Sequence, residues 1–225
     1  MEGPISMKAV ARMRSDFPAK FGIPRQSGLV EALRSRVVFE PEYRNPEALR
    51  GLEGFSHVWL VWYASEAARE GWSPTVRPPR LGGNARMGVF ATRSPFRPNP
   101  IGLSCVKLEE IRFRPEPELV VAGADLMDGT PILDIKPYVP YADCRPEAAG
   151  GFVASGGGET VRVECSREML ERAPAGKREA LLGVLERDPR PSYQKDPARV
   201  YGMTFAGVEV RFRVCEGVLT VVEIK

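Results

Sequence analysis

Residues 76 to 104 read VRPPRLGGNARMGVFATRSPFRPNPIGLS, and the organisation of the whole chain is best worked out from this stretch. No acidic residue interrupts it, whereas arginine recurs between prolines, glycines and asparagines, at Arg77, Arg80, Arg86, Arg93 and Arg97. Proline fixes φ and lacks an amide donor, and paired glycines permit a close turn. The stretch therefore predicts a rigid, exposed loop, with a strand only over residues 85–93.

The arginines indicate which kind of ligand this loop binds. A guanidinium group presents a planar fork of donors and stays charged, so an ordered loop rich in arginine is typical of a phosphate, carboxylate or nucleic-acid site. The alternative is a solvated surface stripe. This stretch lacks the Glu and Asp residues that normally intersperse such a surface, which favours the functional interpretation.

Strands are predicted on both sides of the loop. Residues 55–64 read FSHVWLVWYA, a nearly continuous aromatic and β-branched run that is typical of a strand covered on both faces. Alternation of polar and apolar residues predicts further strands over 7–14, 102–114 and 119–124, and a short one over 36–40. With 22 glycines and 21 prolines as well, the composition favours many short strands joined by structured loops.

Carboxylates and tyrosines crowd the segment 124–143, ADLMDGTPILDIKPYVPYAD. Asp128-Gly129 predicts a tight hairpin, which would place Asp125 and Asp134 on adjoining antiparallel strands near one end of a barrel. If the sheet closes, the arginine loop would be their neighbour. The alternative is that these carboxylates form turns and pair with the arginines.

A domain boundary is expected in residues 147–158, which contain AAGGFVASGGG and have the composition of a linker. A strand over 160–165 is expected to close the first domain. Beyond it, apolar residues at helical spacing predict a helix over 175–187, and residues 208–214 and 218–224 predict a hairpin. The tail is therefore a small α+β unit of roughly 60 residues, marginally stable alone and expected to dock on the first domain.

Several classes of protein are excluded by what the sequence lacks. There is no GxxxxGK[ST] motif, and the glycines at 156–158 neither follow a strand nor open a helix, so P-loop and Rossmann sites are excluded. His57 is the only histidine and is interpreted as a core or rim residue; the four cysteines are widely spaced, so no metal site and no disulfide framework are predicted. With no leader or membrane span recognised, a cytoplasmic protein is expected.

These residues alone indicate a β-rich protein with a cationic rim, a nearby Asp/Tyr cluster and a second basic and aromatic segment over 188–205. That combination suits RNA or nucleotide recognition and does not by itself reveal a reaction. The net charge of +3 tolerates an anionic partner without requiring one.

Five motifs carry a resemblance to a known family: PRQ at 24–26, GLEGFSHVWL at 51–60, TVRPPRLGG at 75–83, GVFATRSPFRPNPIGLS at 88–104 and ADLMDGTPILDIKPYVPYAD at 124–143. In these motifs, which are distributed within residues 5–147, the chain resembles the TsaA-like (YaeB/TrmO) family. In the tail, DPRPSYQ and YGMTF resemble the second domain of its bacterial members.

The resemblance implies an S-adenosylmethionine-dependent methyltransferase that modifies N6 of threonylcarbamoyladenosine beside the anticodon of threonine tRNA. It implies a mainly β fold, with a single-sheet β-barrel catalytic domain over 1–165 that binds the cofactor. A small α+β C-terminal domain over 166–225 is expected to contact tRNA. A homodimer is also implied.

Once this reaction is assumed, site residues are predicted in three groups, of which the cofactor pocket is implied by the resemblance. The reaction is assigned to Asp134 as proton acceptor, to Tyr138 or Tyr141 as orienting groups, and to Asn99. The cofactor pocket is assigned to Pro24, Arg25, Gln26, Trp62, Tyr63, Arg93, Leu103, Asp125, Leu126 and Met127, largely through backbone groups, with Arg93 bridging the methionyl carboxylate. Contacts to tRNA or its threonyl group are assigned to Arg86, Arg97, Asn99, Tyr193, Lys195, Arg199 and Tyr201. Each of these last residues could instead be solvated surface.

Two other functions remain open at this point. A non-catalytic RNA-binding barrel would use the same cationic rim without consuming a methyl donor. A methyltransferase acting on a small molecule would turn over without RNA and would not need residues 166–225.

Overall fold

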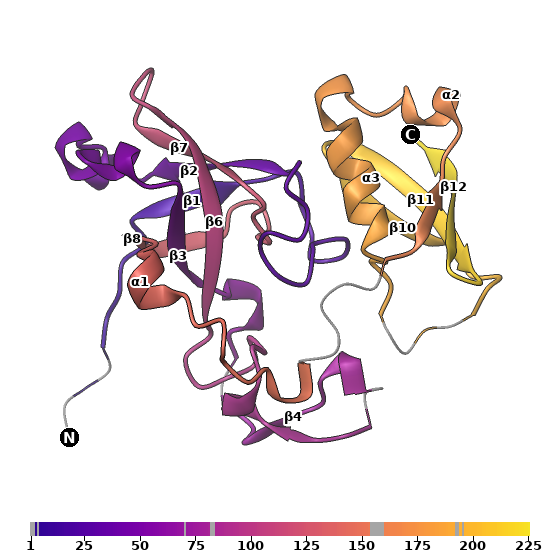
Figure 1. Ribbon diagram of the computed structural model, residues 1–225, viewed down its shortest axis with the longest axis horizontal. Coiled ribbons are helices and arrows are strands. Elements are labelled where there is room, and N and C mark those ends of the chain that lie inside the picture. Colours follow the sequence, from indigo (N-terminus) through magenta and orange to yellow (C-terminus); the bar gives the residue numbers. More distant parts are fainter. Residues whose placement is uncertain are drawn as a thin grey trace.

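A closed β-barrel forms the first part of the computed structural model, which describes residues 3, 5–69, 71–81, 84–153, 160–191, 194 and 196–225 (Figure 1). Its strands are β1 (Ala11–Arg14), β2 (Arg34–Phe39), β3 (His57–Tyr63), β6 (Ile101–Arg112), β7 (Glu118–Ala122) and β8 (Pro131–Pro137). They follow one another around the barrel in the order β1-β2-β7-β6-β3-β8, and every neighbouring pair is antiparallel. The predicted mainly β fold is confirmed.

The barrel closes because alternate residues of each strand point to one core. Met13 on β1, Val37 on β2 and Leu60 on β3 are fully buried, while their sequence neighbours face outward. Val121 on β7 and Ile132 on β8 complete the same core. A period of two with one apolar face is what a half-buried strand requires.

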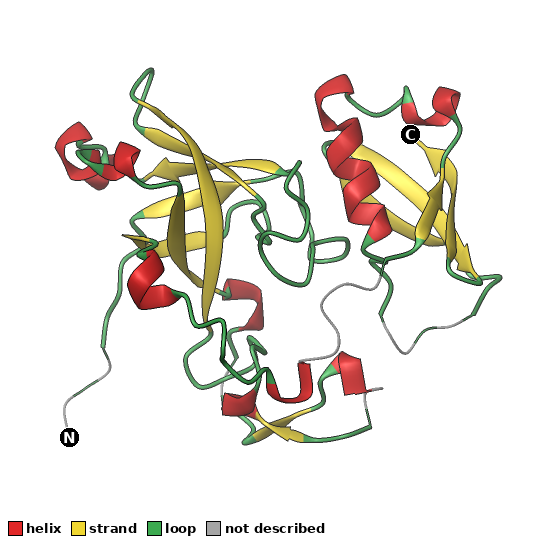
Figure 2. Cartoon of the chain, in the orientation of Figure 1, coloured by secondary structure: helices red, strands yellow, loops and turns green. Residues whose placement is uncertain are grey.

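A smaller α+β unit follows the barrel (Figures 1 and 2). Its sheet has the order β10-β11-β12-β9, built from β10 (Tyr201–Phe205), β11 (Val208–Cys215), β12 (Val218–Ile224) and β9 (Arg162–Glu164). Helix α3 (Arg178–Glu186) covers this sheet with its buried face of Ala180, Leu181, Val184 and Leu185. The predicted helix and C-terminal hairpin are thereby confirmed.

The remaining elements are short. They are η1 (Pro41–Tyr43), η2 (Pro46–Leu49), η3 (Leu52–Gly54), η4 (Ser65–Ala67), β4 (Thr75–Val76), η5 (Pro79–Leu81), β5 (Met87–Gly88), η6 (Val89–Ala91), α1 (Pro140–Asp143), η7 (Gly151–Val153), α2 (Arg167–Leu170) and η8 (Ala175–Lys177). The arginine-rich stretch is mostly loop, as predicted. Its expected strand over 85–93 is reduced to β5, which pairs with β4 and continues into the 3-10 turn η6.

Two further expectations are corrected by the sheet order. The strand over 160–165 does not close the first domain, because β9 pairs in parallel with β12 of the C-terminal sheet. Asp128-Gly129 does form a turn, with Gly129 at φ 78°, but the strands on either side of it are not neighbours. The chain crosses from β7 to β8, which pairs with β1 and β3, so Asp125 and Asp134 do not lie on adjoining strands.

The loop between β1 and β2, residues 15–33, belongs structurally to both parts of the molecule. Phe17, Val30 and Leu33 are buried in the core of the C-terminal unit, together with residues of α3, β10, β11 and β12. Figure 1 shows this loop lying between the barrel and α3. The tail is therefore docked on the barrel through a shared apolar core. Within the described part of the chain, no helix is long and apolar enough to cross a membrane.

Candidate cofactor and nucleic-acid site

A buried polar network lies where β3, β6 and the segment after β7 meet. The indole Nε1 of Trp62 donates to Ser104 Oγ at 3.0 Å, and Ser104 Oγ donates to Asp125 Oδ1 at 2.6 Å. Ser104 is only 1% exposed, so its hydroxyl must be paired within the protein. Gly102, opposite Trp62 on β6, leaves room for the indole ring, because a Cβ there would stand 2.1 Å from it.

Asp125 is held in an environment that opposes its charge. Burial raises the pKa of Asp125, while the Ser104 hydroxyl, backbone N–H groups of Asp125 and Ser27, and the positive charge of Arg93 act in the opposite direction. A carboxylate whose pKa is raised by burial, and which faces a specific cation, is typical of a functional site.

The Pro24–Gln26 turn reaches the same place from the loop 15–33. Arg93 Nη1 donates to Gln26 Oε1 at 2.5 Å, and Gln26 Nε2 donates to the carbonyl oxygen of Arg25 at 2.5 Å. The N–H of Gly28 donates to the carbonyl of Gly123 at 2.8 Å, which brings the turn against the segment that carries Asp125. Pro24 is buried, whereas Arg25 and Arg93 are exposed. The structure thus groups the predicted Gln26, Trp62, Arg93 and Asp125.

The other residues predicted for the cofactor pocket lie beside this group. Tyr63 is half-buried at the end of β3 and pairs with Ile101, and Leu103 on β6 is 52% exposed. Leu126 is a core residue of the barrel, and the Met127 carbonyl accepts from the Thr130 hydroxyl at 2.7 Å. Only the backbone of Leu126 is therefore available to a ligand.

The residues predicted for proton transfer lie elsewhere on the barrel. Asp134 pairs with Lys136 at 2.8 Å, and both lie on the outward side of β8, because Ile135 between them packs against the core. Tyr138 packs its ring near Trp59 at 5.9 Å between centroids.

Tyr141 is 89% exposed on α1, and Asn99 is exposed in the arginine-rich loop. Among the described residues, no side-chain hydrogen bond, ion pair or ring contact joins Asp134, Tyr138, Tyr141 or Asn99 to the Trp62–Ser104–Asp125 network.

The surroundings of Tyr138 decide whether its phenol can act as a base. Desolvation and the neighbouring Cys144 thiol raise the pKa of Tyr138, so its phenol remains protonated at neutral pH. His57, predicted to be a rim residue, is half-buried, with Nδ1 2.9 Å from Ser56 Oγ and its ring in contact with Tyr138. Tyr138 in this state can orient or donate, which agrees with an orienting group rather than a base.

Arginines and aromatic rings alternate on the outside of the loop. Arg97 lies 5.9 Å over the Phe90 ring, and Phe90 packs against Trp72 at 6.2 Å between centroids. Arg69 lies 5.1 Å over the ring of Phe96. Trp72, Phe90 and Phe96 are 52%, 73% and 42% exposed, so their rings are open to a partner. We call Arg69, Trp72, Phe90, Phe96 and Arg97 the basic-aromatic surface.

Sequence reasoning missed part of both groups. Ser104 and Ser27 were not assigned, nor were Trp72, Phe90 and Phe96, although the last two stand within the stretch of alternating Arg and aromatic residues. That alternation was the available signal. Arg86 donates to the Thr75 hydroxyl at 3.1 Å across the β4–β5 pair, which orients it within this loop.

The structure describes two of the four tail residues predicted to contact tRNA, Arg199 and Tyr201. The prediction that Tyr201 stacks on a base is wrong, because its side chain is 5% exposed and stacks on Phe212 in the C-terminal core. Arg199 is exposed and lies 5.3 Å over the Tyr201 ring. Tyr193 and Lys195 lie outside the described residues.

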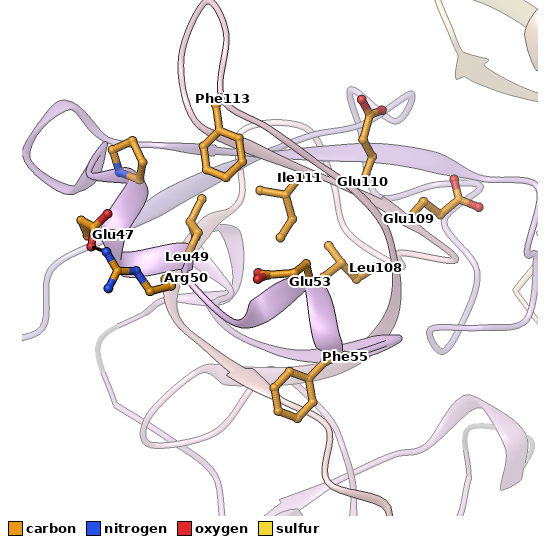
Figure 3. Close-up of a pocket in the computed structure, with 11 residues that line it drawn as sticks. Glu47, Leu49, Arg50, Glu53, Phe55, Leu108, Glu109, Glu110, Ile111 and Phe113 are labelled. Carbon is orange, nitrogen blue, oxygen red and sulfur yellow. Dashed lines mark hydrogen bonds and ion pairs between the residues drawn. The ribbon is translucent and has the colours of Figure 1, made fainter.

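A separate cavity of about 500 Å³ opens between η2, η3 and β6, away from all the residues predicted for the site (Figure 3). Leu49, Leu108 and Ile111 form its floor, Phe55 and Phe113 its two ends, and Glu53 points into it (Figure 3). Its rim includes Glu47, Glu109 and Glu110. An acidic rim disfavours phosphate, so this cavity does not extend the nucleic-acid site.

Taken together, the fold and site define a class: closed-barrel proteins with an arginine-bearing polar site at the joined loops of the barrel. Residues 12–144 match the tRNA-methyltransferase O N-terminal domain, and residues 159–225 match the TrmO C-terminal domain. The chain therefore belongs to the tRNA-methyltransferase O family.

Individual relatives agree over nearly the whole chain. The tRNA (adenine(37)-N6)-methyltransferase of Escherichia coli K12 is 41% identical over 213 residues, which cover 91% of each chain. A Pseudomonas aeruginosa protein provisionally named as the S-adenosylmethionine-dependent methyltransferase RcsF is 43% identical over 215 residues, 92% of this chain and 91% of its own. A crystal structure of TrmO from P. aeruginosa superposes with a TM-score of 0.81 at 35% identity, covering 100% of this chain and 98% of that one.

Proposed function

We propose that this protein transfers a methyl group from S-adenosylmethionine to N6 of threonylcarbamoyladenosine at position 37 of threonine tRNA. The observation that carries the proposal is the 41% identity to the E. coli tRNA (adenine(37)-N6)-methyltransferase across both domains. The threonylcarbamoyl group and the choice of threonine tRNA go beyond what this identity supports. They rest on the motif resemblance and on an arginine-rich loop suited to an additional carboxylate.

The residues present fit S-adenosylmethionine. Its methionyl carboxylate needs a cation, which the exposed Arg93 supplies, and its ammonium group needs an anion, which Asp125 supplies beside Arg93. The backbone at Pro24–Gln26 and 125–127 would surround the adenine. When bound, the cofactor supplies an electrophilic methyl group, and the protein's contribution is to align that methyl with the attacking nitrogen.

The attacking nitrogen must lose its proton, because N6 between a purine and a carbonyl is poorly basic. Asp134 is our proposed acceptor. Its carboxylate pairs with Lys136 and accepts from the N–H of Ile135 at 2.9 Å, so these two contacts must break before the carboxylate can accept the N6 proton. Asp125 is a second candidate, because its raised pKa makes the carboxylate a stronger proton acceptor.

The RNA is proposed to bind the basic-aromatic surface. Exposed aromatic rings stack on unpaired bases of an anticodon loop, and Arg97 and Arg69 pair with phosphates. Arg86 and Asn99 are proposed to extend the contact, and the C-terminal domain is proposed to touch the tRNA through Arg199. We further propose that the enzyme acts in the cytoplasm as a homodimer.

The first experiment is radiolabelled methyl transfer from S-adenosylmethionine to threonine tRNA, with and without the threonylcarbamoyl group. Label confined to the modified tRNA is the expected result. Label on neither RNA, combined with salt-dependent RNA binding, would instead identify a non-catalytic RNA-binding barrel. Methylation of a small molecule without RNA would instead identify a small-molecule methyltransferase.

The Asp134→Asn variant tests the acceptor. Methyl transfer should fall at least a hundredfold, the usual contribution of a general base, while cofactor binding by calorimetry stays unchanged. Asp125→Asn should instead weaken cofactor binding itself. Normal turnover of Asp134→Asn, with transfer lost from Asp125→Asn at saturating cofactor, would move the base to Asp125.

A further inference from the structure

The loop 15–33 is held from the C-terminal side along its length. Phe17 packs edge-on against Phe205 at 5.3 Å between ring centroids, and Phe21 stacks on Phe212 at 6.4 Å and 5°. Gly22 has φ 100°, and a Cβ there would stand 2.8 Å from the sulfur of Met203. This close approach of loop and sheet requires glycine.

Polar contacts fix the register of the two parts. The N–H of Ala206 donates to the carbonyl of Asp16 at 2.9 Å, and Lys177 Nζ lies 2.7 Å from Asp16 Oδ2. The side chains of this ion pair are only 31% and 14% exposed, so the pair is shielded from solvent more than an ordinary surface pair. Both contacts are made by Asp16, near the start of the loop that carries Pro24–Gln26.

At the turn itself, the C-terminal domain contacts a predicted site residue. Arg25 Nη2 donates to the carbonyl oxygen of Arg190 at 3.3 Å. Asp188 orients that carbonyl: its Oδ1 accepts from the backbone N–H of Arg190 at 3.3 Å, and its carboxylate takes Arg190 Nε and Nη2 at 2.8 Å each. A bidentate fork of this kind sets geometry as well as energy.

We propose that Asp188 is a positioning residue for the cofactor site, and that the C-terminal domain acts as a clamp on the Pro24–Gln26 turn. From Asp188, contacts run through Arg190 and Arg25 to Gln26. Gln26 in turn accepts from Arg93, whose positive charge acts on Asp125. This rests on the proposed function, in which that turn holds S-adenosylmethionine. It assigns the C-terminal domain a role in cofactor binding in addition to any contact with tRNA.

The test measures the Kd for S-adenosylmethionine in the full chain, separately from the KM for tRNA. Asp188→Gly removes both contacts without backbone strain, since Asp188 has φ 46°. It should weaken cofactor binding about tenfold, a usual size for coupling between distant sites, and kcat at saturating cofactor should be retained. Asp188→Asn keeps the acceptor for the Arg190 N–H and should restore most of the affinity.

Coupling between the two sides is the sharper readout. Arg25→Ala should weaken cofactor binding, and adding Asp188→Gly to it should cause no further loss, because the second contact is already broken. Arg167→Ala, which breaks an exposed ion pair with Glu171 in the same domain, is the matched control and should leave Kd unchanged. Additive effects of Arg25→Ala and Asp188→Gly, or an Asp188→Gly effect confined to the KM for tRNA, would overturn the clamp.

A second variant and a measurement without cofactor test the clamp independently of the proposed methyl transfer. If Asp188→Gly does not fold, Lys177→Ala removes a second side-chain contact between the loop and the C-terminal domain, the ion pair with Asp16, and should also weaken cofactor binding at unchanged kcat. If the wild type neither binds S-adenosylmethionine nor transfers methyl, the proposed function has failed. Hydrogen exchange of the amides of residues 22–28 then tests the clamp directly. Faster exchange in Asp188→Gly than in wild type is expected, and equal exchange overturns the clamp.

Discussion

At the scale of single residues, the site is governed by one buried carboxylate and the space around one indole. Asp125 accepts from Ser104, Ser104 accepts from Trp62, and Trp62 lies across Gly102. The position of each side chain in this network depends on the next one, so a small substitution at one position should disturb the whole hydrogen-bond network.

Asp125→Asn should change how stability depends on pH. The folded pKa of Asp125 is raised, so the native state binds this proton more tightly than the unfolded chain. The stability this group contributes is present below the unfolded pKa of about 3.9 and is lost as pH rises through the folded pKa. Urea unfolding from pH 4 to 8 should therefore show wild type losing stability relative to Asp125→Asn as pH rises. A relative gain would mean that the carboxylate is stabilised as an anion.

Gly102→Ala should destabilise the barrel by about 1–3 kcal/mol, the usual cost of overpacking. The new Cβ would meet the Trp62 ring at 2.1–2.6 Å, so the indole must move and release Ser104. Chemical denaturation measures the loss. Gly54→Ala is the control, because a Cβ at Gly54 meets nothing within 4 Å; equal effects of the two changes would contradict the packing argument.

At the scale of elements, η6 carries Phe90 of the basic-aromatic surface and directly follows β5 of the β4–β5 pair. A two-residue ladder cannot be stable alone, and proline, glycine and the rings around it supply the remaining rigidity. The aromatic side chains are exposed because the element is too small to bury them. Exposure of several rings together is typical of a binding surface.

Phe90→Ala should raise the KM for tRNA about tenfold, since stacking on a base is worth 1–3 kcal/mol, and should leave the Kd for S-adenosylmethionine unchanged. Phe113→Ala is the matched control. Phe113 is 50% exposed, but it lines the acidic cavity rather than the basic-aromatic surface. An equal rise in KM for both variants would show a general loss of structure instead of a lost RNA contact.

At the scale of the whole molecule, the barrel and the C-terminal unit share a core through the loop 15–33. Phe17, Val30 and Leu33 would be exposed if the C-terminal unit opened. A Cβ on Gly183 of α3 would lie 2.8 Å from Val30, so the helix and loop are in close contact. The molecule should accordingly unfold as one cooperative unit.

Spectroscopy can check this cooperativity, because the three tryptophans, Trp59, Trp62 and Trp72, all lie in the barrel part. Helix α3 lies in the C-terminal unit. Tryptophan fluorescence and circular dichroism at 222 nm should therefore report coincident transitions in urea. Two separated midpoints would show that the domains unfold independently and that the shared core contributes little.

The amino-acid sequence by itself determined the mainly β class, the strand positions at β3, β6 and β7, helix α3 and the final hairpin. These features depend on local periodicity and turn chemistry, which neighbouring residues specify. The family also followed from the sequence, because its motifs are long. Gln26, Arg93 and Asp125 were assigned through those motifs and Trp62 through the family resemblance, and spacing alone would not have joined positions so far apart.

Only the tertiary structure decided which of these residues meet. The tertiary structure separated Asp125 from Asp134 through the order of strands around the barrel, placed β9 in the C-terminal sheet and buried Tyr201 in the core of that sheet. It also revealed Ser104 as the link between Trp62 and Asp125, and Asp188 as the support of the Pro24–Gln26 turn. Closure of a barrel and docking of a domain are long-range packing events, whose partners are selected by the burial of the whole core rather than by any local pattern.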